Sequence, residues 1–417
     1  MSFKIFKNTV LLFVFILISC GSKSNSKVQV ENIETPQIEN KTITVGANRT
    51  SEYLPLLSEK RVGIVANQTS VIFKQTAMSQ APRNDNYMHL VDSLVALNIN
   101  VKKVFSPEHG FRGSADAGEH VEDGVDIKTG LSIFSLHGKN KKPSKEHLKD
   151  VDIVIFDIQD VGVRFYTYIS TLHYVMEACA ENNIPLIVLD RPNPNGSYLD
   201  GPTMEKEHQS FLGMHPIPLV HGMTIGEYAQ MINGEKWLKN GVQCDVTIIN
   251  CKNYNHDKSY SLAIRPSPNL PNDQSIKLYP SLGLFEGTNI NAGRGTEFQF
   301  QRYGAPFLSP ETMVFTYKPQ ANFGAKYPKH KGDLCYGENL SNEAVNNEMT
   351  LKWIIKAYEN SMDKSLFFLT NGFTKHAGTT KLQQQIEAGM TEAEIKATWQ
   401  EGLEKFKTTR SKYLIYN

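Results

Sequence analysis

The sequence lacks the patterns that most often mark metal, redox and dinucleotide sites. Its 417 residues include five cysteines but no CxxC pair, and no HExxH motif occurs, so no metal site has a strong spacing signal. No GxGxxG turn follows the first predicted strand, residues 61–67, so the fingerprint of a dinucleotide-binding sheet is missing. The chain also lacks a charge excess, because 44 Lys and Arg residues balance 43 Asp and Glu residues. Because the protein has no large net positive charge to attract nucleic acid, no nucleic-acid partner is expected.

The first twenty residues are predicted to be an export signal. Lys4 and Lys7 precede an apolar run, residues 10–18, that is too short to span a membrane comfortably. The sequence LISC, ending at Cys20, looks like a bacterial lipobox, which predicts cleavage before Cys20 and attachment of lipid to it. The alternative is a plain signal peptide with an incidental cysteine. We expect an exported, membrane-anchored lipoprotein that faces the periplasm, with residues 21–45 as a disordered tether.

Strands and helices alternate along residues 46–307. Short apolar runs predict buried strands, and apolar positions at helical spacing predict helices between them. The strands are expected at 61–67, 101–105, 132–136, 153–158, 185–189 and 246–249, and the helices at 87–97, 168–182 and 224–238. This order predicts an α/β fold with a parallel sheet, right-handed crossovers and helices on both faces. Residues 308–417 are predicted to form a smaller C-terminal α+β domain.

Four of the predicted strands give way to polar or acidic residues at their carboxyl ends. The four ends are residues 67–70, 106–108, 157–160 and 190–196. Ligands of open parallel sheets bind outside the carboxyl ends of the strands, so the four ends together predict a pocket there.

The end of the second strand carries the first candidate group. Glu108, His109 and Arg112 lie between Pro107 and a glycine at 113, and Glu119 follows shortly after. A buried carboxylic acid can keep its proton near neutral pH and donate it to a leaving oxygen. The alternative is a loop carboxylate that is satisfied by backbone N–H groups.

A second candidate group follows the strand at 153–158. Asp157 and Asp160 leave that strand, and Arg164, Tyr166 and Tyr168 precede the next helix. Tyrosine rings stack on sugars, and an arginine fork suits a carboxylate on a ligand. An internal ion pair between Asp160 and Arg164 is the competing interpretation.

Two further candidates come later in the chain. His221 lies at a helix start, where the N-terminus attracts anions and lowers the pKa of a nearby histidine, although a lone histidine is more often structural. Asn289 and Arg294 belong to a segment rich in special residues, and Arg294 stands between two glycines, where packing explains a cation poorly. A ligand-binding role is therefore favoured for Arg294.

Six motifs occur in order: FSPEHGFRG, DIQDVGVRFYTYISTL, VLDRPNPNG, HGMTIGE, PSPNLP and EGTNINAGRGT. Together they resemble the NamZ family of exo-β-N-acetylmuramidases. The resemblance implies a Rossmann-like domain, a smaller C-terminal domain, an active site in the cleft between them and no nucleotide cofactor. It also implies release of N-acetylmuramic acid from the non-reducing end of peptidoglycan fragments, with Glu108 at the position of the family's proposed catalytic glutamate. One departure is Gln301, where the family often has glutamate, so that position receives no acid or base role.

The resulting hypothesis is a glycoside hydrolase, which generally needs two carboxyl groups beside the scissile bond. Glu108 is the predicted general acid, and its predicted partner is Glu119 first, then Asp157 or Asp160. Predicted contacts to the saccharide come from residues already described: Arg112, Arg164 or Arg294 to the lactyl carboxylate, Tyr166, Tyr168 and Asn289 along the sugar, and His109 and His221 beside them.

Two other functions fit parts of the same pattern. A non-catalytic lipoprotein that captures muropeptides or another acidic sugar would use the same arginines and tyrosines without needing Glu108. A metal-dependent hydrolase would use His109, Glu119, His120 and Asp157, and its loss of activity in a chelator would distinguish it.

Overall fold

The computed structural model describes residues 42–74, 86–113, 119 and 122–416. The predicted signal peptide, lipidation at Cys20, the tether as far as residue 41, and His120 lie outside the described residues. Residues 42–417 form one compact unit, and its described part begins with Thr44 paired to Lys252 and with Val45 buried. None of the described helices is long and apolar enough to cross a membrane.

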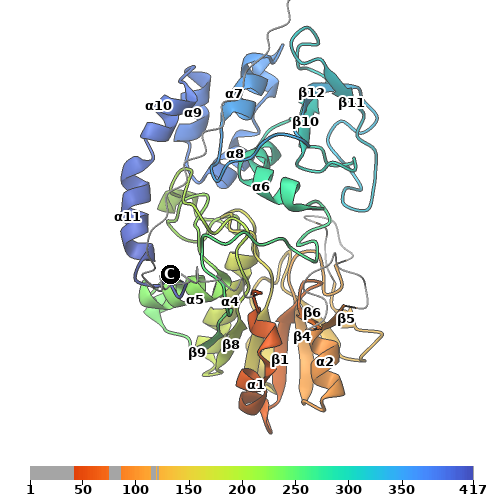
Figure 1. The fold of residues 1–417 in the computed structure, drawn as a ribbon, viewed down its shortest axis with the longest axis vertical. Helices are drawn as coiled ribbons and strands as arrows, with labels where there is room; N and C mark the ends of the chain where they lie inside the picture. Colours follow the sequence, from red (N-terminus) through yellow and green to blue (C-terminus); the bar gives the residue numbers. More distant parts are fainter. Residues whose placement is uncertain (1–41, 75–85, 114–118, 120–121, 417) are drawn as a thin grey trace, which may run out of the picture. The chain divides into compact units, whose positions relative to one another are not determined.

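The large sheet has seven strands in the order β5-β6-β4-β1-β7-β8-β9 (Figure 1). Every neighbouring pair is parallel except β5 with β6, at one edge. The strands are β1 (Val62–Ala66), β4 (Val101–Ser106), β5 (Gly124–Val125), β6 (Ser132–Ser135), β7 (Ile153–Asp157), β8 (Leu186–Leu189) and β9 (Val246–Ile249). The predicted α/β class is thus confirmed.

Both faces of this sheet are covered, because successive side chains of a strand point to opposite sides. On β7, Ile153 and Ile155 join a buried cluster with Leu90 and Leu94 of α2 (Leu90–Ala96). Val154 and Phe156 belong to a second cluster, which includes residues of α4 (Tyr168–Glu181) and α5 (Ile225–Gly234). The helix predicted at 87–97 begins only at Leu90, because residues 87–89 form β3 (Tyr87–His89), which pairs with β2 (Val71–Phe73).

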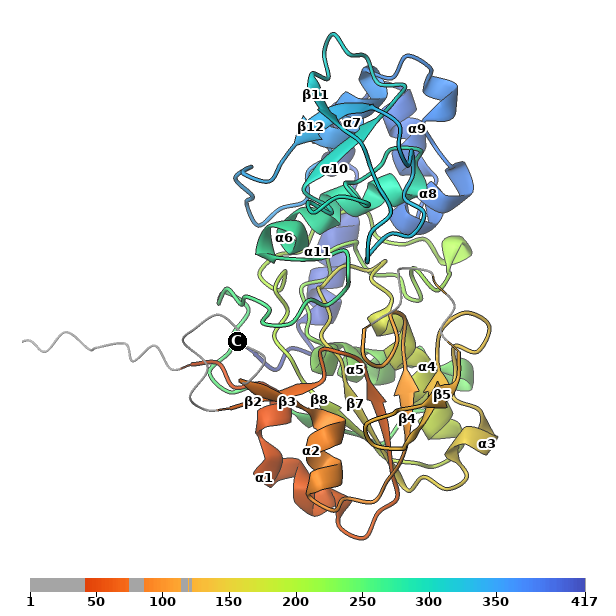
Figure 2. The same cartoon turned by 90° about the vertical axis from the view of Figure 1, so that its right-hand side faces the viewer.

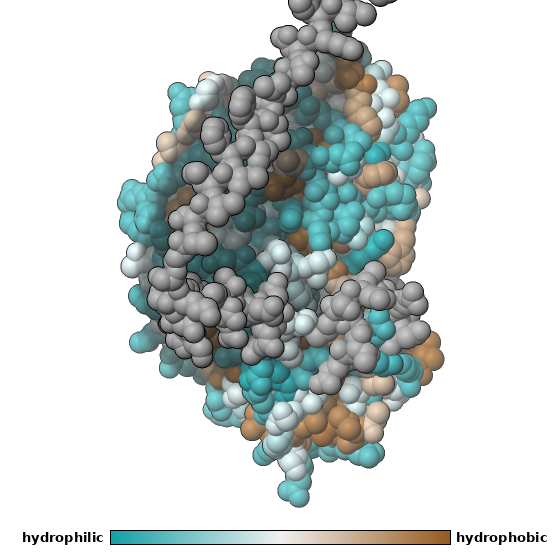
Figure 3. Space-filling model, viewed as in Figure 1, coloured by the Kyte–Doolittle hydropathy of each residue, from teal (hydrophilic) through white to brown (hydrophobic). Residues whose placement is uncertain are grey.

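The C-terminal part holds a second, antiparallel sheet of three strands and most of the remaining helices (Figure 2). The strands are β10 (Arg302–Ala305), β11 (Phe315–Tyr317) and β12 (Cys335–Asn339), and the helices are α6 (Asp273–Leu282), the short η6 (Gly283–Gly287), α7 (Lys352–Glu359), α8 (Thr370–Ala377), α9 (Lys381–Glu387), α10 (Glu392–Ala397) and α11 (Gln400–Arg410). A smaller C-terminal domain is therefore confirmed, and its boundary at residue 308 stays a prediction. On the face seen in Figure 3, hydrophobic residues lie in small groups among hydrophilic ones.

The end of the chain returns to the large sheet. The Tyr416 hydroxyl donates to Oδ2 of Asp190 at 2.6 Å and accepts from the backbone N–H of Cys251 at 2.8 Å. Asp190 directly follows β8 and is fully buried, and this burial raises the pKa of its carboxyl to about 6. The last residues thus belong to the polar network at the carboxyl edge of the first sheet.

Candidate active site

A pocket of about 260 Å³ lies at the carboxyl edge of the large sheet and is lined by both parts of the molecule. The loop after β4 and the segment before α4 contribute one wall, and residues between 267 and 300, together with Leu212 and α8, contribute the rest. The lining residues are Glu108, His109, Phe165, Tyr166, Thr167, Leu212, Ser267, Asn269, Leu270, Tyr279, Glu286, Arg294, Phe300 and His376. Four predicted site residues are among them: Glu108, His109, Tyr166 and Arg294.

Glu108 reaches the pocket because the chain turns sharply at the end of β4. The carbonyl of Pro107 accepts from the N–H of Gly110 at 3.1 Å, and His109 and Gly110 have φ angles of 73° and 79°. A left-handed φ is unusual for a residue such as His109, which is held there while its side chain is buried. The Thr167 hydroxyl donates to Oε2 of Glu108 at 2.8 Å. The turn and this hydrogen bond together fix the direction of the carboxyl group.

The second carboxylate of the pocket is Glu286, to which the sequence analysis gave no role. Nη1 of Arg294 lies 3.2 Å from Oε1 of Glu286, and Nε2 of His376 lies 4.0 Å from Oε2. Acidic residues at strand ends were the sequence signal for a site, whereas Glu286 comes from η6, within the motif EGTNINAGRGT. Glu286 and Arg294 occur in the same motif, and this proximity was the sequence signal that could have identified Glu286 as a site residue.

Lys329 holds the backbone beneath Glu286. Its ammonium group donates to the carbonyls of Phe285 and Glu286 at 3.0 and 3.1 Å, and also to the carbonyl of Thr288. Burial lowers the pKa of this lysine to about 8. One half-buried cation therefore fixes the turn that presents the second carboxylate.

Arg164 has a structural role, which corrects its predicted contact with a ligand carboxylate. The side chain is fully buried, and its guanidinium donates to four backbone carbonyls. Nη1 contacts Pro202 and Ile217, both at 2.8 Å, and Nη2 contacts His376 at 3.1 Å and Ala377 at 2.6 Å. The competing interpretation, an ion pair with Asp160, is also wrong, because these carbonyls occupy the guanidinium.

The two aspartates at the carboxyl end of β7 also face inward. Asp157 is fully buried in an ion pair with Arg191, with contacts of 2.6 and 2.9 Å, so it is not available as a catalytic partner or a metal ligand. Oδ2 of Asp160 accepts from the N–H of Gly162 at 2.7 Å and lies 3.7 Å from Nε2 of His221. Neither Asp160 nor His221 is among the lining residues. The predicted catalytic role of Asp160 and the predicted saccharide contact of His221 are therefore replaced by a buried contact between the two side chains.

Three more predicted residues lie outside the pocket lining. Arg112 forms ion pairs with Asp92 at 3.0 Å and Asp126 at 2.7 Å, which tie its loop to α2 and to the turn after β5. Glu119 pairs with Lys326. Asn289 donates to the carbonyl of Leu366 at 2.6 Å and therefore braces the backbone.

The two predicted tyrosines are held by one backbone carbonyl. The hydroxyls of Tyr166 and Tyr168 donate to the carbonyl of Pro266 at 2.7 and 3.2 Å, and the two rings meet edge to face. Tyr166 lines the pocket, whereas Tyr168 lies behind it and accepts from the Asn67 amide at 2.9 Å. Tyr168 thus supports the wall from behind.

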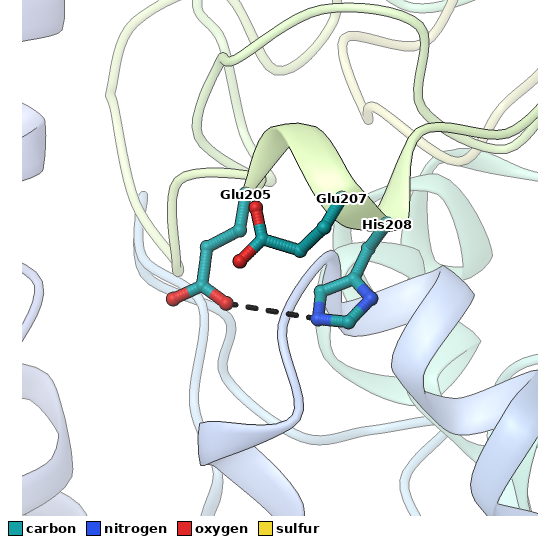
Figure 4. A group of neighbouring side chains, drawn as sticks. All are labelled: Glu205, Glu207 and His208. Atoms are coloured by element: carbon teal, nitrogen blue, oxygen red, sulfur yellow. Dashed lines mark ion pairs between the residues drawn. The ribbon is translucent and has the colours of Figure 1, made fainter.

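Within the described residues, one group has the geometry to hold a metal ion: Glu205, Glu207 and His208 (Figure 4). All three belong to one short turn, and none lines the pocket. Glu205 is paired with Lys381 at 2.6 Å, so a cation of the protein already lies beside this group.

Comparison with known proteins places this chain in one family. The profile of the N-terminal domain of exo-β-N-acetylmuramidase NamZ matches residues 62–274, and the C-terminal profile matches residues 277–416. The chain belongs to the NamZ family. The peptidoglycan β-N-acetylmuramidase NamZ of Bacillus subtilis (strain 168) is 40% identical over 387 residues, which cover 88% of this chain and 89% of the relative.

Two solved structures share the fold of this NamZ family member. Both are DUF1343 family proteins of Bacteroides fragilis NCTC 9343. One is 43% identical with a TM-score of 0.80, and the other is 27% identical with a TM-score of 0.74. Each comparison covers 90% of this chain and 99% of the solved one.

Proposed function

We propose that this protein is an exo-acting glycoside hydrolase that releases N-acetylmuramic acid from the non-reducing end of peptidoglycan fragments. The observation that carries the proposal is one pocket holding two carboxyl groups, Glu108 and Glu286, beside the cation Arg294. Most glycosidases use two carboxyl groups that flank the scissile bond. The 40% identical muramidase of Bacillus subtilis supports the same substrate class.

The two carboxyl groups have different proposed roles. Glu108, which accepts a hydrogen bond from the Thr167 hydroxyl, donates a proton to the leaving oxygen as the glycosidic bond breaks. Glu286 lies 3.2 Å from the guanidinium of Arg294, and in the proposed mechanism it acts as a carboxylate. An ionised carboxylate stabilises the positive charge that develops on the sugar ring in the transition state.

Arg294 is also the proposed recognition group for the substrate. Muramic acid differs from glucosamine by a lactyl carboxylate, and a guanidinium binds a carboxylate with a matched pair of N–H donors. A substrate without that carboxylate would leave this interaction unmade, so a pocket built around Arg294 discriminates against it.

The test of this function compares two sugars on the same aromatic leaving group. The detergent-solubilised full-length chain should release the chromophore from an aryl β-N-acetylmuramide at least about 10³-fold faster than from the matching glucosaminide. Similar rates on both would contradict recognition of the carboxylate. Binding of the muramide in calorimetry without turnover would leave a non-catalytic binding lipoprotein instead.

Glu286→Gln should lower kcat for the muramide by about 100-fold, because it removes a negative charge from beside the developing positive charge. KM should change much less. Glu297→Gln is the matched control, since Glu297 is an exposed carboxylate three residues from Arg294. A change confined to KM would instead give Glu286 a role in holding Arg294 for binding.

We also propose that the protein is an exported lipoprotein, anchored through Cys20 and facing the periplasm. Release of wall fragments takes place outside the cytoplasm, and the sequence of the first twenty residues supports export. Membrane fractionation of cells carrying the wild type or Cys20→Ala tests the anchor, and a membrane-bound variant would contradict it.

A further inference from the structure

The loop between β11 and β12, residues 318–334, extends from the small sheet toward the part that holds the large sheet (Figure 2). It reaches the candidate active site. Nη2 of Arg294, which lines the pocket, approaches the carbonyl of Gly324 at 3.5 Å. A Cβ atom at Gly324 would lie only 2.8 Å from Oδ1 of Asn269, another lining residue. The loop therefore lies directly against the pocket wall.

This β11–β12 loop is fastened along its length. Gln320 donates its N–H to the carbonyl of Gly295 at 2.8 Å, and the Asn322 amide donates to the carbonyl of Thr296 at 3.1 Å. Further along, the ion pair of Lys326 with Glu119 joins the loop to the segment after β4. Lys329 and His330 then donate to carbonyls between residues 285 and 289. The backbone of the loop is thus held on both sides of its middle.

Two aromatic side chains of the loop remain in solvent despite these contacts. Phe323 is 65% exposed and Tyr327 is 90% exposed. They flank Gly324 and Lys326, the two residues that join the loop to the pocket wall and to the opposite segment. These large aromatic rings are exposed on a loop whose backbone is held beside the pocket, and loop residues that a rigid scaffold positions in this way commonly serve binding.

We propose that Phe323 and Tyr327 form a subsite for the sugar on the leaving-group side of the scissile bond. This proposal rests on the proposed function: an exo-acting enzyme encloses one terminal sugar, so the rest of the glycan must leave the pocket across its edge. The occupant is the N-acetylglucosamine residue that follows muramic acid. It is a neutral ring whose C–H face suits an aromatic surface, and stacking on flat rings holds such a group without a charge. The two aromatics would thus set a preference for glycan fragments over simple glycosides.

The experiment measures kcat/KM on two substrates with the full-length chain. One is the β-linked disaccharide of N-acetylmuramic acid and N-acetylglucosamine, and the other is methyl β-N-acetylmuramide, which lacks the second sugar. Phe323→Ala and Tyr327→Ala should each lower the ratio of the disaccharide value to the methyl glycoside value by about tenfold, which corresponds to roughly 1.4 kcal/mol. Tyr327→Trp should restore the ratio. Val314→Ala is the control, since Val314 is 78% exposed next to the other end of β11.

The methyl glycoside keeps this proposal separate from the proposed function. If the wild type hydrolyses neither the disaccharide nor the methyl glycoside, the muramidase assignment itself fails. If both variants lose equal activity on the two substrates, the loop only supports the pocket, and the subsite is overturned. An unchanged ratio in both variants also overturns it.

Discussion

Glu108→Gln is expected to lower kcat on the natural disaccharide by about a thousandfold, because the amide has no proton to give to the sugar oxygen that leaves. The side chain keeps its shape, so the hydrogen bond from Thr167 and the bend after β4 should persist. Steady-state kinetics on the disaccharide and on a dinitrophenyl muramide test the role. The phenolate leaves without protonation, so the loss on the second substrate should be much smaller.

Glu119→Gln is the matched control for this experiment. Glu119 was the preferred second carboxylate on sequence grounds, yet it pairs with Lys326 and is not a lining residue of the pocket. We expect its variant to stay within a few-fold of the wild type. A large loss in Glu119→Gln together with a small one in Glu108→Gln would reverse the assignment of the acid.

Arg164→Met should destabilise the protein severely, by about 4 kcal/mol or more, because it leaves four buried carbonyls without their donor. Methionine has a similar length but donates no hydrogen bond. Urea unfolding followed by tryptophan fluorescence measures the change in the free energy of unfolding. Arg164→Lys should recover little of the lost stability, since one ammonium group cannot reach all four carbonyls that the planar guanidinium contacts.

Arg112→Met provides the surface comparison. Arg112 also makes two ion pairs, but its side chain is 34% exposed, and such pairs contribute about 1 kcal/mol or less. A normally stable Arg164→Met that had lost affinity for the muramide would contradict the structural role and return Arg164 to the substrate.

The fold was predictable because its signal is local. The apolar runs at 101–105, 153–158 and 185–189 each became a strand of the large sheet, and the helix after Tyr168 forms as its periodicity indicates. The exception at residues 87–89 depends on pairing with β2, which the apolar spacing of the segment does not show. Glu108 was also predictable, since a strand followed by proline and glycine places it at a sheet edge.

The rest of the site depends on partners that are distant in sequence. Asp157 and Arg164 looked available because nothing beside them in the chain neutralises them. In the folded protein, Arg191 forms an ion pair with Asp157, and the Arg164 guanidinium donates to backbone carbonyls of residues between 202 and 377. Glu286 is the opposite example, because the sequence did not mark it and the structure places it in the pocket. It lines the same pocket as Glu108 only because α6 and η6 pack against the first sheet. Which charged residue stays available for chemistry is therefore decided by tertiary structure.

The contact of Tyr416 with Asp190 has a consequence for the cooperativity of unfolding. The Tyr416 hydroxyl joins the Thr224 hydroxyl and the N–H of Gly226 as a donor to one buried carboxyl group, although Tyr416 and Asp190 are 226 positions apart in the sequence. Detachment of the segment that carries Tyr416 would remove a donor from this buried carboxyl group, which costs free energy. We therefore expect this segment to unfold together with the large sheet and not to fray separately, and native-state hydrogen exchange measures the difference.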